Sequence, residues 1–391
     1  MTASNLPPTA AGPARPTPSS PRVGIPRHRL LLLFGGGLGL VIGTYTGLAR
    51  AGIDHRFAPP EAHGIFMVLG FLGTLIALER AVAVGRRWAY AAPALSGASV
   101  LWLVSPLPRA GAGVLLAIAG GVVTATYAYL LRAGWHTHLA IMAVGALAWV
   151  SAALLWTAGM GPVRITPLLA AFLVLTVVGE RLELSRLTLP GAASRRRFLV
   201  AVGVFAAGVA ISVLPSGAHP VVTMRALGLV VAGIGMLGQV AWLLRYDVAR
   251  RTVRREGLPR FAAICILAAY LWLTVSAVLW VAVGLGATGA LLHDALVHAL
   301  FLGFVFSMVM GHAPIIMPAV LRVPMHFLKL AYLPLVLLHL SVAVRVVADL
   351  AGSFLWREVA LHGNVAALVL FVIVAVTSTR RGLRQAKGAT P

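Results

Sequence analysis

The sequence predicts an all-α integral membrane protein, and three observations support that prediction. Of the 391 residues, 60% are hydrophobic and only 11% are charged, too few charges to cover a water-soluble protein of this length. The apolar residues form long uncharged runs, each long enough to cross the ~30 Å hydrocarbon core of a bilayer as a helix. The positive charges concentrate in alternate segments between the runs, which is typical of multi-pass membrane proteins.

Twelve such runs follow one another, and we expect each to form one transmembrane helix. The ninth and tenth runs share an uncharged stretch, which we divide near Gly284, Gly286 and Gly289. A transmembrane β-barrel would require segments of alternating polarity, and none is present. The runs are Leu30–Ala49, Ala62–Ala83, Trp88–Val104, Ala110–Leu131, His138–Gly159, Ile165–Leu189, Phe198–Leu214, Thr223–Leu244, Phe261–Val283, Leu291–Gly311, Phe327–Leu350 and Leu355–Thr379.

The runs predict one membrane domain over residues 29–379, flanked by two short tails. Residues 1–28 are rich in Pro, Ala, Ser and Thr, and we expect a disordered cytosolic tail. Residues 380–391 predict a second cytosolic tail, which is basic.

The net charge is +22, from 32 Lys and Arg against 10 Asp and Glu. Such a balance is also typical of nucleic-acid binding. With the N-terminal tail placed inside, however, the inner segments contain 25 of these cations, the outer loops contain 6, and Arg345 lies within the eleventh run. This asymmetry predicts a cytoplasmic (plasma) membrane protein with both termini cytosolic, whose partner is the lipid bilayer and not a nucleic acid.

Cysteine usage limits the cofactors that the chain can hold. Cys265 is the only cysteine, which excludes an internal disulfide, a cysteine-based zinc site, an iron–sulfur cluster and a covalently attached c-type haem.

Ionisable residues inside the membrane are costly, so each is a candidate for function. The topology places His63 near the outer end of the second run and His298 in the outer third of the tenth. Two histidines at one depth on different helices are what a bis-imidazole haem requires. Asp294 lies four residues before His298, so its carboxylate could orient that imidazole. Gly70 shares a helical face with His63 and would leave room for a flat macrocycle.

Other polar groups admit more than one interpretation. Any single membrane histidine can instead be a hydrogen-bonding contact between helices. Glu79-Arg80 and Glu180-Arg181 are expected to be interfacial ion pairs, with proton entry as the alternative. The methionines around His312 are soft ligands that suit copper(I), with packing as the alternative.

Several motifs resemble those of known membrane proteins. The segment Pro60–Phe71, with Ala62-His63-Gly64, resembles the second helix of haem–copper oxidase subunit I, and more closely that of the NnrS family. Further motifs resemble other helices of that family; they are Thr176–Arg181, His298-Ala299-Leu300 followed by Gly311-His312, Leu338-His339-Leu340 through Arg345-Val346, and Gly363–Ala367.

The resemblance implies a bundle of twelve helices like that of oxidase subunit I. It implies that His63 and His298 hold a haem or metal, with Asp294 beside the site and His312 and His339 as further candidates. The implied cofactors are haem b and copper. The implied role is in the response to nitric oxide or in denitrification, with nitric oxide or a redox protein as partner.

The chain also departs from the family pattern. Glu180 replaces a glycine, Leu300 occupies the second position of a His-x-His pair, and runs six and seven contain no histidine. These departures argue against a complete haem–copper reductase centre and favour a single haem, or a site that has lost its metal. We therefore expect an NnrS-like haem protein; a proton-coupled transporter and a b-type cytochrome that transfers electrons are the alternatives.

Overall fold

A computed structural model of the chain describes residues 26–50, 52, 57–188, 190–215 and 223–388, and every regular element that they form is a helix. Among these residues, eleven helices are long and apolar enough to cross a membrane, so the prediction of a multi-pass helical membrane protein is confirmed. They are α1 (Arg27–Ala49), a composite helix (Pro60–Val84), α5 (Arg109–Ala133), α6 (Thr137–Thr157), α7 (Pro162–Leu184) with η4 (Ser185–Thr188), α8 (Ala192–Val213), α9 (Met224–Tyr246), α11 (Gly257–Gly284), a second composite helix (Leu292–Leu321), η6 (Lys329–Ala331) with α14 (Tyr332–Ala351), and α15 (Phe354–Gly388).

The third predicted run forms a shorter helical stretch, η3 (Arg87–Tyr90) followed by α4 (Ala91–Leu103). It lies along α5. Near one end, Arg86 donates hydrogen bonds of 2.8 and 3.1 Å to the Tyr129 hydroxyl. At the other end, the Trp102 indole donates a 2.9 Å hydrogen bond to the carbonyl of Pro108. The stretch therefore extends beside α5 from one end of that helix to the other.

Two composite helices contain π-helical segments. The first joins η1 (Pro60–Ala62), α2 (His63–Ile65), the π-helix η2 (Phe66–Gly73) and α3 (Thr74–Val84). The second joins α12 (Leu292–His298), the π-helix η5 (Ala299–Phe306) and α13 (Ser307–Leu321). Segments of this kind are rare and are often found at functional sites.

Several predicted boundaries are wrong. The tenth span continues through α13 to Leu321, ten residues beyond Gly311, although Pro314 and Pro318 lie within it. In a membrane protein, neighbouring groups can form hydrogen bonds with the backbone carbonyls that a proline leaves unpaired. The basic segment from residue 380 begins as the last turns of α15 and not as a tail. α1 begins at Arg27, within the predicted N-terminal tail. Residues 1–25 and 389–391 lie outside the described residues.

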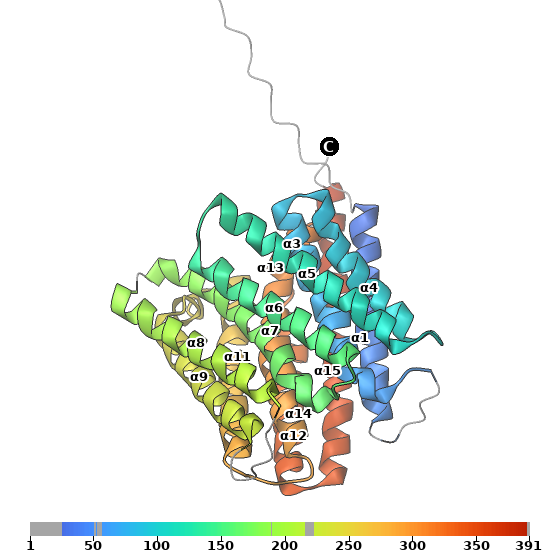
Figure 1. Ribbon diagram of the computed structural model, residues 1–391. Coiled ribbons are helices and arrows are strands. Elements are labelled where there is room, and N and C mark those ends of the chain that lie inside the picture. Colours follow the sequence, from blue (N-terminus) through green and yellow to red (C-terminus); the bar gives the residue numbers. More distant parts are fainter. Residues whose placement is uncertain (1–25, 51, 53–56, 189, 216–222, 389–391) are drawn as a thin grey trace, which may run out of the picture.

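Helices that follow one another in sequence pack side by side, and α1 begins at the end of the bundle where α15 finishes (Figure 1). Leu32 of α1 and Leu383 of α15 both pack against a cluster that contains Val320 and Leu321 of α13. We call this the inner end and the opposite one the outer end. α12 and the start of α15 lie at the outer end, as does the break between α11 and α12, where Gly286 has φ +97°. The division predicted near Gly286 is thus confirmed.

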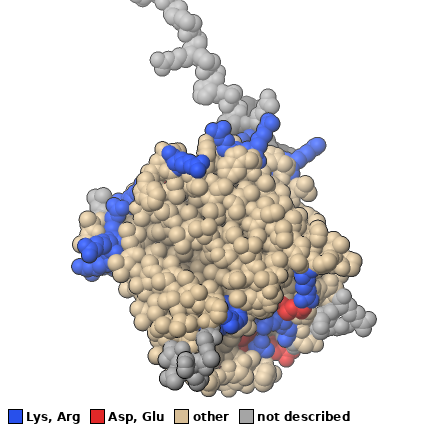
Figure 2. Space-filling view, in the orientation of Figure 1, with Lys and Arg blue, Asp and Glu red and all other residues tan. Residues whose placement is uncertain are grey.

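The surface between the two ends is apolar. Figure 2 shows a broad band without charge, with Lys and Arg gathered at the inner end and acidic and basic residues together at the outer end. Large hydrophobic side chains such as Leu31, Phe34 and Val347 are 71%, 67% and 65% exposed. A belt of this kind is what a lipid bilayer covers.

Candidate functional site

A cavity of about 580 Å³ lies at the outer end of the bundle, and both predicted haem-site histidines line it. His63 and His298 come from the two composite helices, and Asp294 and Arg345 line the same space. A volume of this size is typical of sites for small molecules and cofactors. The structure therefore brings together residues that the sequence separates by more than two hundred positions.

His63 is held by a glycine face of α1. Its Nδ1 lies 2.7 Å from the carbonyl oxygen of Gly43, which makes Nδ1 the protonated nitrogen. A Cβ at Gly47 would lie 2.9 Å from His63 Cε1, and one at Gly39 would lie 2.9 Å from the main chain of Gly70. Three glycines spaced four residues apart thus let α1 approach closely enough to fix the ring.

His298 is held in the same way. Its Nδ1 lies 2.8 Å from the carbonyl oxygen of Asp294, one turn earlier. The Nε2 atoms of His63 and His298 form no hydrogen bond with any residue that the structure describes. A histidine that donates from one ring nitrogen to a carbonyl and leaves the other free has the arrangement found in metal-ligating histidines.

The two π-helices set these histidines at matching heights. Phe71 of η2 stacks on Phe306 of η5 with ring centroids 6.0 Å apart, and each phenylalanine follows its histidine by eight residues. The inner ends of both composite helices also meet, where Leu78 packs with Leu321. The two helices therefore run in the same direction, so the common depth inferred for the two rings agrees with their packing.

Asp294 has a different main role from the one expected. Its Oδ2 accepts hydrogen bonds from Arg345 Nε at 3.1 Å and Nη2 at 2.8 Å, and lies 3.5 Å from Arg357 Nε. The same oxygen is 3.4 Å from His298 Nδ1. Asp349 lies 3.3 Å from Arg357 and completes a cluster of two carboxylates and two guanidinium groups. The carboxylate of Asp294 mainly positions Arg345 and only secondarily faces the imidazole.

Gly70 does not make room for a macrocycle, so that prediction is wrong. A Cβ on Gly70 would lie 2.8 Å from Val100 Cγ2, and Gly70 is not among the residues that line the cavity. The π-helix is the reason, because its hydrogen-bonding pattern does not follow the α-helical rotation from which we counted the face.

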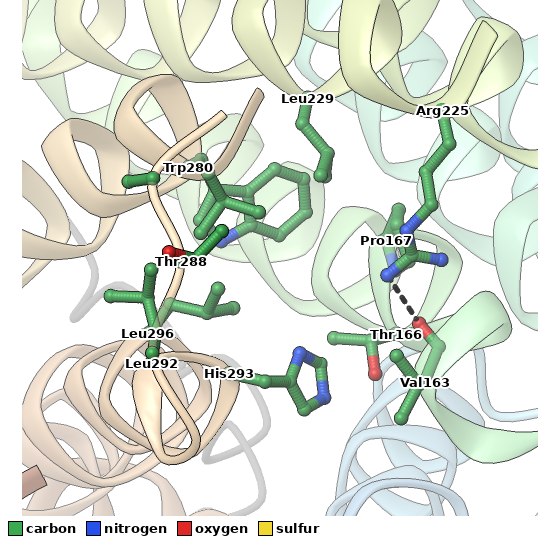
Figure 3. Close-up of a pocket in the computed structure, with 13 residues that line it drawn as sticks. Val163, Thr166, Pro167, Arg225, Leu229, Trp280, Thr288, Leu292, His293 and Leu296 are labelled. Atoms are coloured by element: carbon green, nitrogen blue, oxygen red, sulfur yellow. Dashed lines mark hydrogen bonds between the residues drawn. The ribbon is translucent and has the colours of Figure 1, made fainter. Parts of the chain in front are cut away.

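His293 precedes His298 by five residues on α12, a rotation that would direct it away from His298 in an α-helix, yet it also lies at the site. It lines the large cavity and also a second cavity beside it (Figure 3). The smaller cavity contains Arg225 and Trp280.

His339 lies away from the cavity and forms a hydrogen-bonded contact between helices. Trp272 Nε1 donates a 2.8 Å hydrogen bond to His339 Nδ1, and His339 Nε2 lies 3.4 Å from the Ser307 hydroxyl. Both ring nitrogens are therefore engaged by neighbouring side chains.

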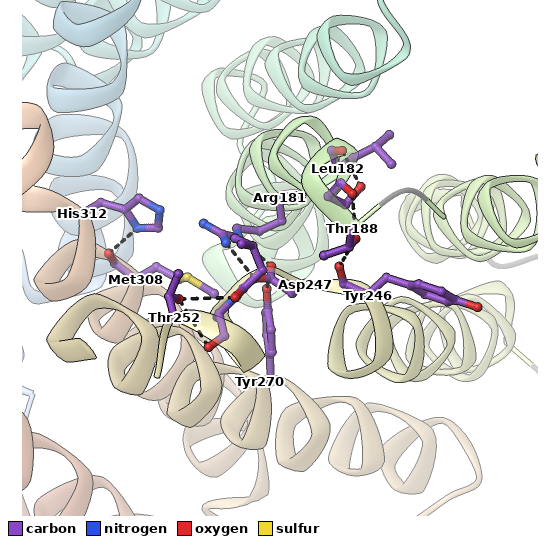
Figure 4. A network of polar contacts seen from close by, with 12 residues as sticks. Arg181, Leu182, Thr188, Tyr246, Asp247, Thr252, Tyr270, Met308 and His312 are labelled. Atoms are coloured by element: carbon purple, nitrogen blue, oxygen red, sulfur yellow. Dashed lines mark hydrogen bonds and ion pairs between the residues drawn. The ribbon is translucent and has the colours of Figure 1, made fainter. Parts of the chain in front are cut away.

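His312 belongs to the inner half of the bundle. Its Nδ1 is 2.7 Å from the carbonyl of Met308, and Figure 4 shows the ring beside the network of Arg181, Asp247 and Tyr270. Arg181 donates two 2.7 Å hydrogen bonds to the Asp247 carboxylate, and the Tyr270 hydroxyl donates another at 2.6 Å.

The ion pairs at the inner end form both within one span and between spans. Arg80 contacts Glu79 at 2.5 Å and Glu180 at 2.6 Å, so one guanidinium serves two carboxylates. Arg181 pairs with Asp247 and not with the neighbouring Glu180.

Three arginines border the large cavity, namely Arg50, Arg345 and Arg357. The Nε2 atoms of His63 and His298 could hold a haem iron. The arginines could pair with haem carboxylates, although Arg345 and Arg357 already contact Asp294 and Asp349. Among the described residues, no group of three or more His, Cys, Asp or Glu side chains could hold a metal ion. The donor set thus fits a haem. Copper, expected from the methionines around His312 and from the resemblance, stays a prediction.

Sequence reasoning missed Arg50, Arg357 and Gly47. The two arginines were counted only as outer-loop charges, although any cation at the outer end is a candidate partner for an anionic cofactor group. A spacing of four residues from Gly39 to Gly47 was visible in the sequence, but which helix it faces was not.

Comparison with known proteins adds one match. The family described as "Domain of unknown function (DUF8744)" matches residues 29–380. No curated protein matches the chain.

Proposed function

The chain belongs to the DUF8744 family, and we propose that it is a haem-binding protein that crosses the cytoplasmic membrane twelve times. The observation that carries this proposal is the pair His63 and His298, which line one outer cavity with Nδ1 held by a main-chain carbonyl and Nε2 free.

Twelve crossings follow if η3 and α4 are counted as a span. That stretch lies along α5 from end to end. An even number of crossings also brings the start of α1 and the end of α15 to the same side of the membrane, which agrees with their packing at the inner end. The charge asymmetry places that side in the cytosol. Reporter fusions at both termini, active only in the cytosol, test the orientation; activity at one terminus alone would exclude an even number of crossings.

A bound haem would supply one-electron redox chemistry. The chain's own residues would perform three tasks. His63 and His298 would hold the iron through Nε2, the carbonyls of Gly43 and Asp294 would fix their rings, and Arg50, which lines the same cavity, would pair with a carboxylate of the cofactor.

The test is the absorbance spectrum of the purified protein, oxidised and reduced, after expression with ample haem supply. We expect a Soret band in the wild type and its loss in His63→Ala and in His298→Ala. His339→Ala is the matched control, because that ring lies outside the cavity, and it should retain the band. A colourless wild-type protein would refute the proposal. Addition of nitric oxide to the reduced protein then tests whether the spectrum responds to that gas.

A proton-coupled transporter is the second candidate. It is favoured by the inner cluster in which Arg80 contacts both Glu79 and Glu180, because one cation cannot balance two ionised carboxylates. A colourless wild type that moves protons across vesicle membranes, and a Glu180→Gln variant that does not, would favour this reading over haem binding.

A further inference from the structure

A second cavity of about 330 Å³ lies at the outer end between α7, α9, α11 and the start of α12. Figure 3 shows Arg225 reaching from α9 to the main chain of α7, with His293 directed toward the same space. Trp280 also lines the cavity, and the remaining wall is largely apolar, with side chains such as Leu229 and Leu296.

Two strong hydrogen-bond donors in this cavity have no partner in the described chain. Trp280 is fully buried, and its indole N–H makes no hydrogen bond. Arg225 donates from Nη2 to the carbonyl of Val163 at 3.1 Å, while its Nη1 is buried and unpaired. Leaving a buried donor unsatisfied costs about 1–3 kcal/mol, and arginine and tryptophan side chains can only donate. The missing partner must therefore be a hydrogen-bond acceptor.

The charge of the site favours an anionic acceptor. No Asp or Glu is among the described residues that line the cavity. Arg225 donates a hydrogen bond to the carbonyl of Val163, the neighbour of Arg164 in the sequence. In the part of the chain that the structure describes, neither Arg225 nor Arg164 forms an ion pair with an acidic residue. A partly buried cation without a counter-charge is unfavourable, so an anionic ligand would stabilise the site.

We propose that this cavity binds an oxyanion, a carboxylate or a phosphate, through Arg225 and Trp280, with His293 beside it. The guanidinium fork matches the two oxygens of such a group, and the apolar wall accommodates an attached hydrocarbon portion. The same chemistry has two sources, a small soluble anion and the phosphate of an anionic lipid in the outer leaflet. The proposal does not depend on haem, because neither His63 nor His298 lines this cavity.

The experiment measures the thermal unfolding midpoint of the full-length protein in neutral detergent, after removal of bound lipid. Sodium butyrate and inorganic phosphate are titrated separately against chloride at constant ionic strength. A parallel arm compares nanodiscs of phosphatidylcholine with nanodiscs that also contain phosphatidylglycerol. Because a ligand that binds only the folded state raises the midpoint, we expect a rise with at least one probe. A rise with free anions identifies a soluble ligand, and a rise only with phosphatidylglycerol identifies the lipid phosphate.

Variants connect the effect to this cavity. Arg225→Gln should weaken binding about tenfold to a hundredfold, because it removes a charged hydrogen bond, and Trp280→Phe should weaken it several-fold. Arg132→Gln changes an exposed arginine on α5 and should bind like the wild type. The proposal fails if no probe raises the midpoint, or if both Arg225→Gln and Trp280→Phe respond as the wild type does. His63→Ala should keep the response, which separates failure of this site from failure of haem binding.

Discussion

Replacing Asp294 with Asn should destabilise the protein more than any other single change at the outer cavity. The carboxylate is one of two that balance Arg345 and Arg357 in a buried cluster, where its Oδ2 lies 2.8 Å from Arg345 and 3.5 Å from Arg357. Asp294→Asn leaves Asp349 alone against two cations. Removing one partner of a buried ion pair costs about 3–5 kcal/mol, which corresponds to a shift of about a hundredfold to a few thousandfold in the unfolding equilibrium.

The free energy of unfolding can be measured by SDS titration in mixed micelles, followed by far-UV circular dichroism. Glu358→Gln is the matched control, because Glu358 lines the same cavity but is exposed; it should change stability by less than about 0.5 kcal/mol. The double variant Asp294→Asn with Arg345→Gln restores the charge balance, so it should be more stable than the sum of the single effects by about 0.5–3 kcal/mol. Additive single effects, or an Asp294→Asn protein as stable as the wild type, would refute the reasoning.

Two further predictions concern the packing around the histidine and the inner network. Gly47→Val should displace the His63 ring and reduce haem incorporation, because even a Cβ at Gly47 would lie 2.9 Å from that ring. Gly37→Val is the control, because a Cβ at Gly37 would have no other residue within 4 Å, and it should leave the Soret band intact. Equal spectra for the two variants would contradict this packing. Asp247→Asn should lower the free energy of unfolding by about 3–5 kcal/mol, since it leaves the buried Arg181 without its counter-charge, and a change below about 1 kcal/mol in the same SDS titration would show that this pair is not stabilising.

Much of the fold was predictable because the bilayer imposes simple rules on sequence. A helix must remain apolar for the thickness of the membrane, so uncharged runs mark the spans, and eleven of the twelve predicted runs correspond to long apolar helices. The ends were less accurate because a helix can continue beyond the apolar run, as α13 and α15 do.

The site was predictable in depth but not in detail. His63 and His298 could be assigned a common depth because the charge pattern orients each span. The face of Gly70 could not be predicted, because no hydrophobic periodicity reveals where an α-helix becomes a π-helix. The partner of Asp294 was also hidden, since Arg345 is 51 positions away and only packing between helices joins them.

The two π-helices have a consequence for how the halves of the protein are related. A π-helix contains more residues per turn than an α-helix, so the turns below Phe66–Gly73 and Ala299–Phe306 are out of rotational phase with the turns above them. Each histidine therefore faces a direction that is independent of the polar groups further down the same helix, Glu79 in one case and His312 in the other. Shortening either segment by one residue would rotate the outer chamber relative to the inner charges while leaving both sets of side chains chemically intact.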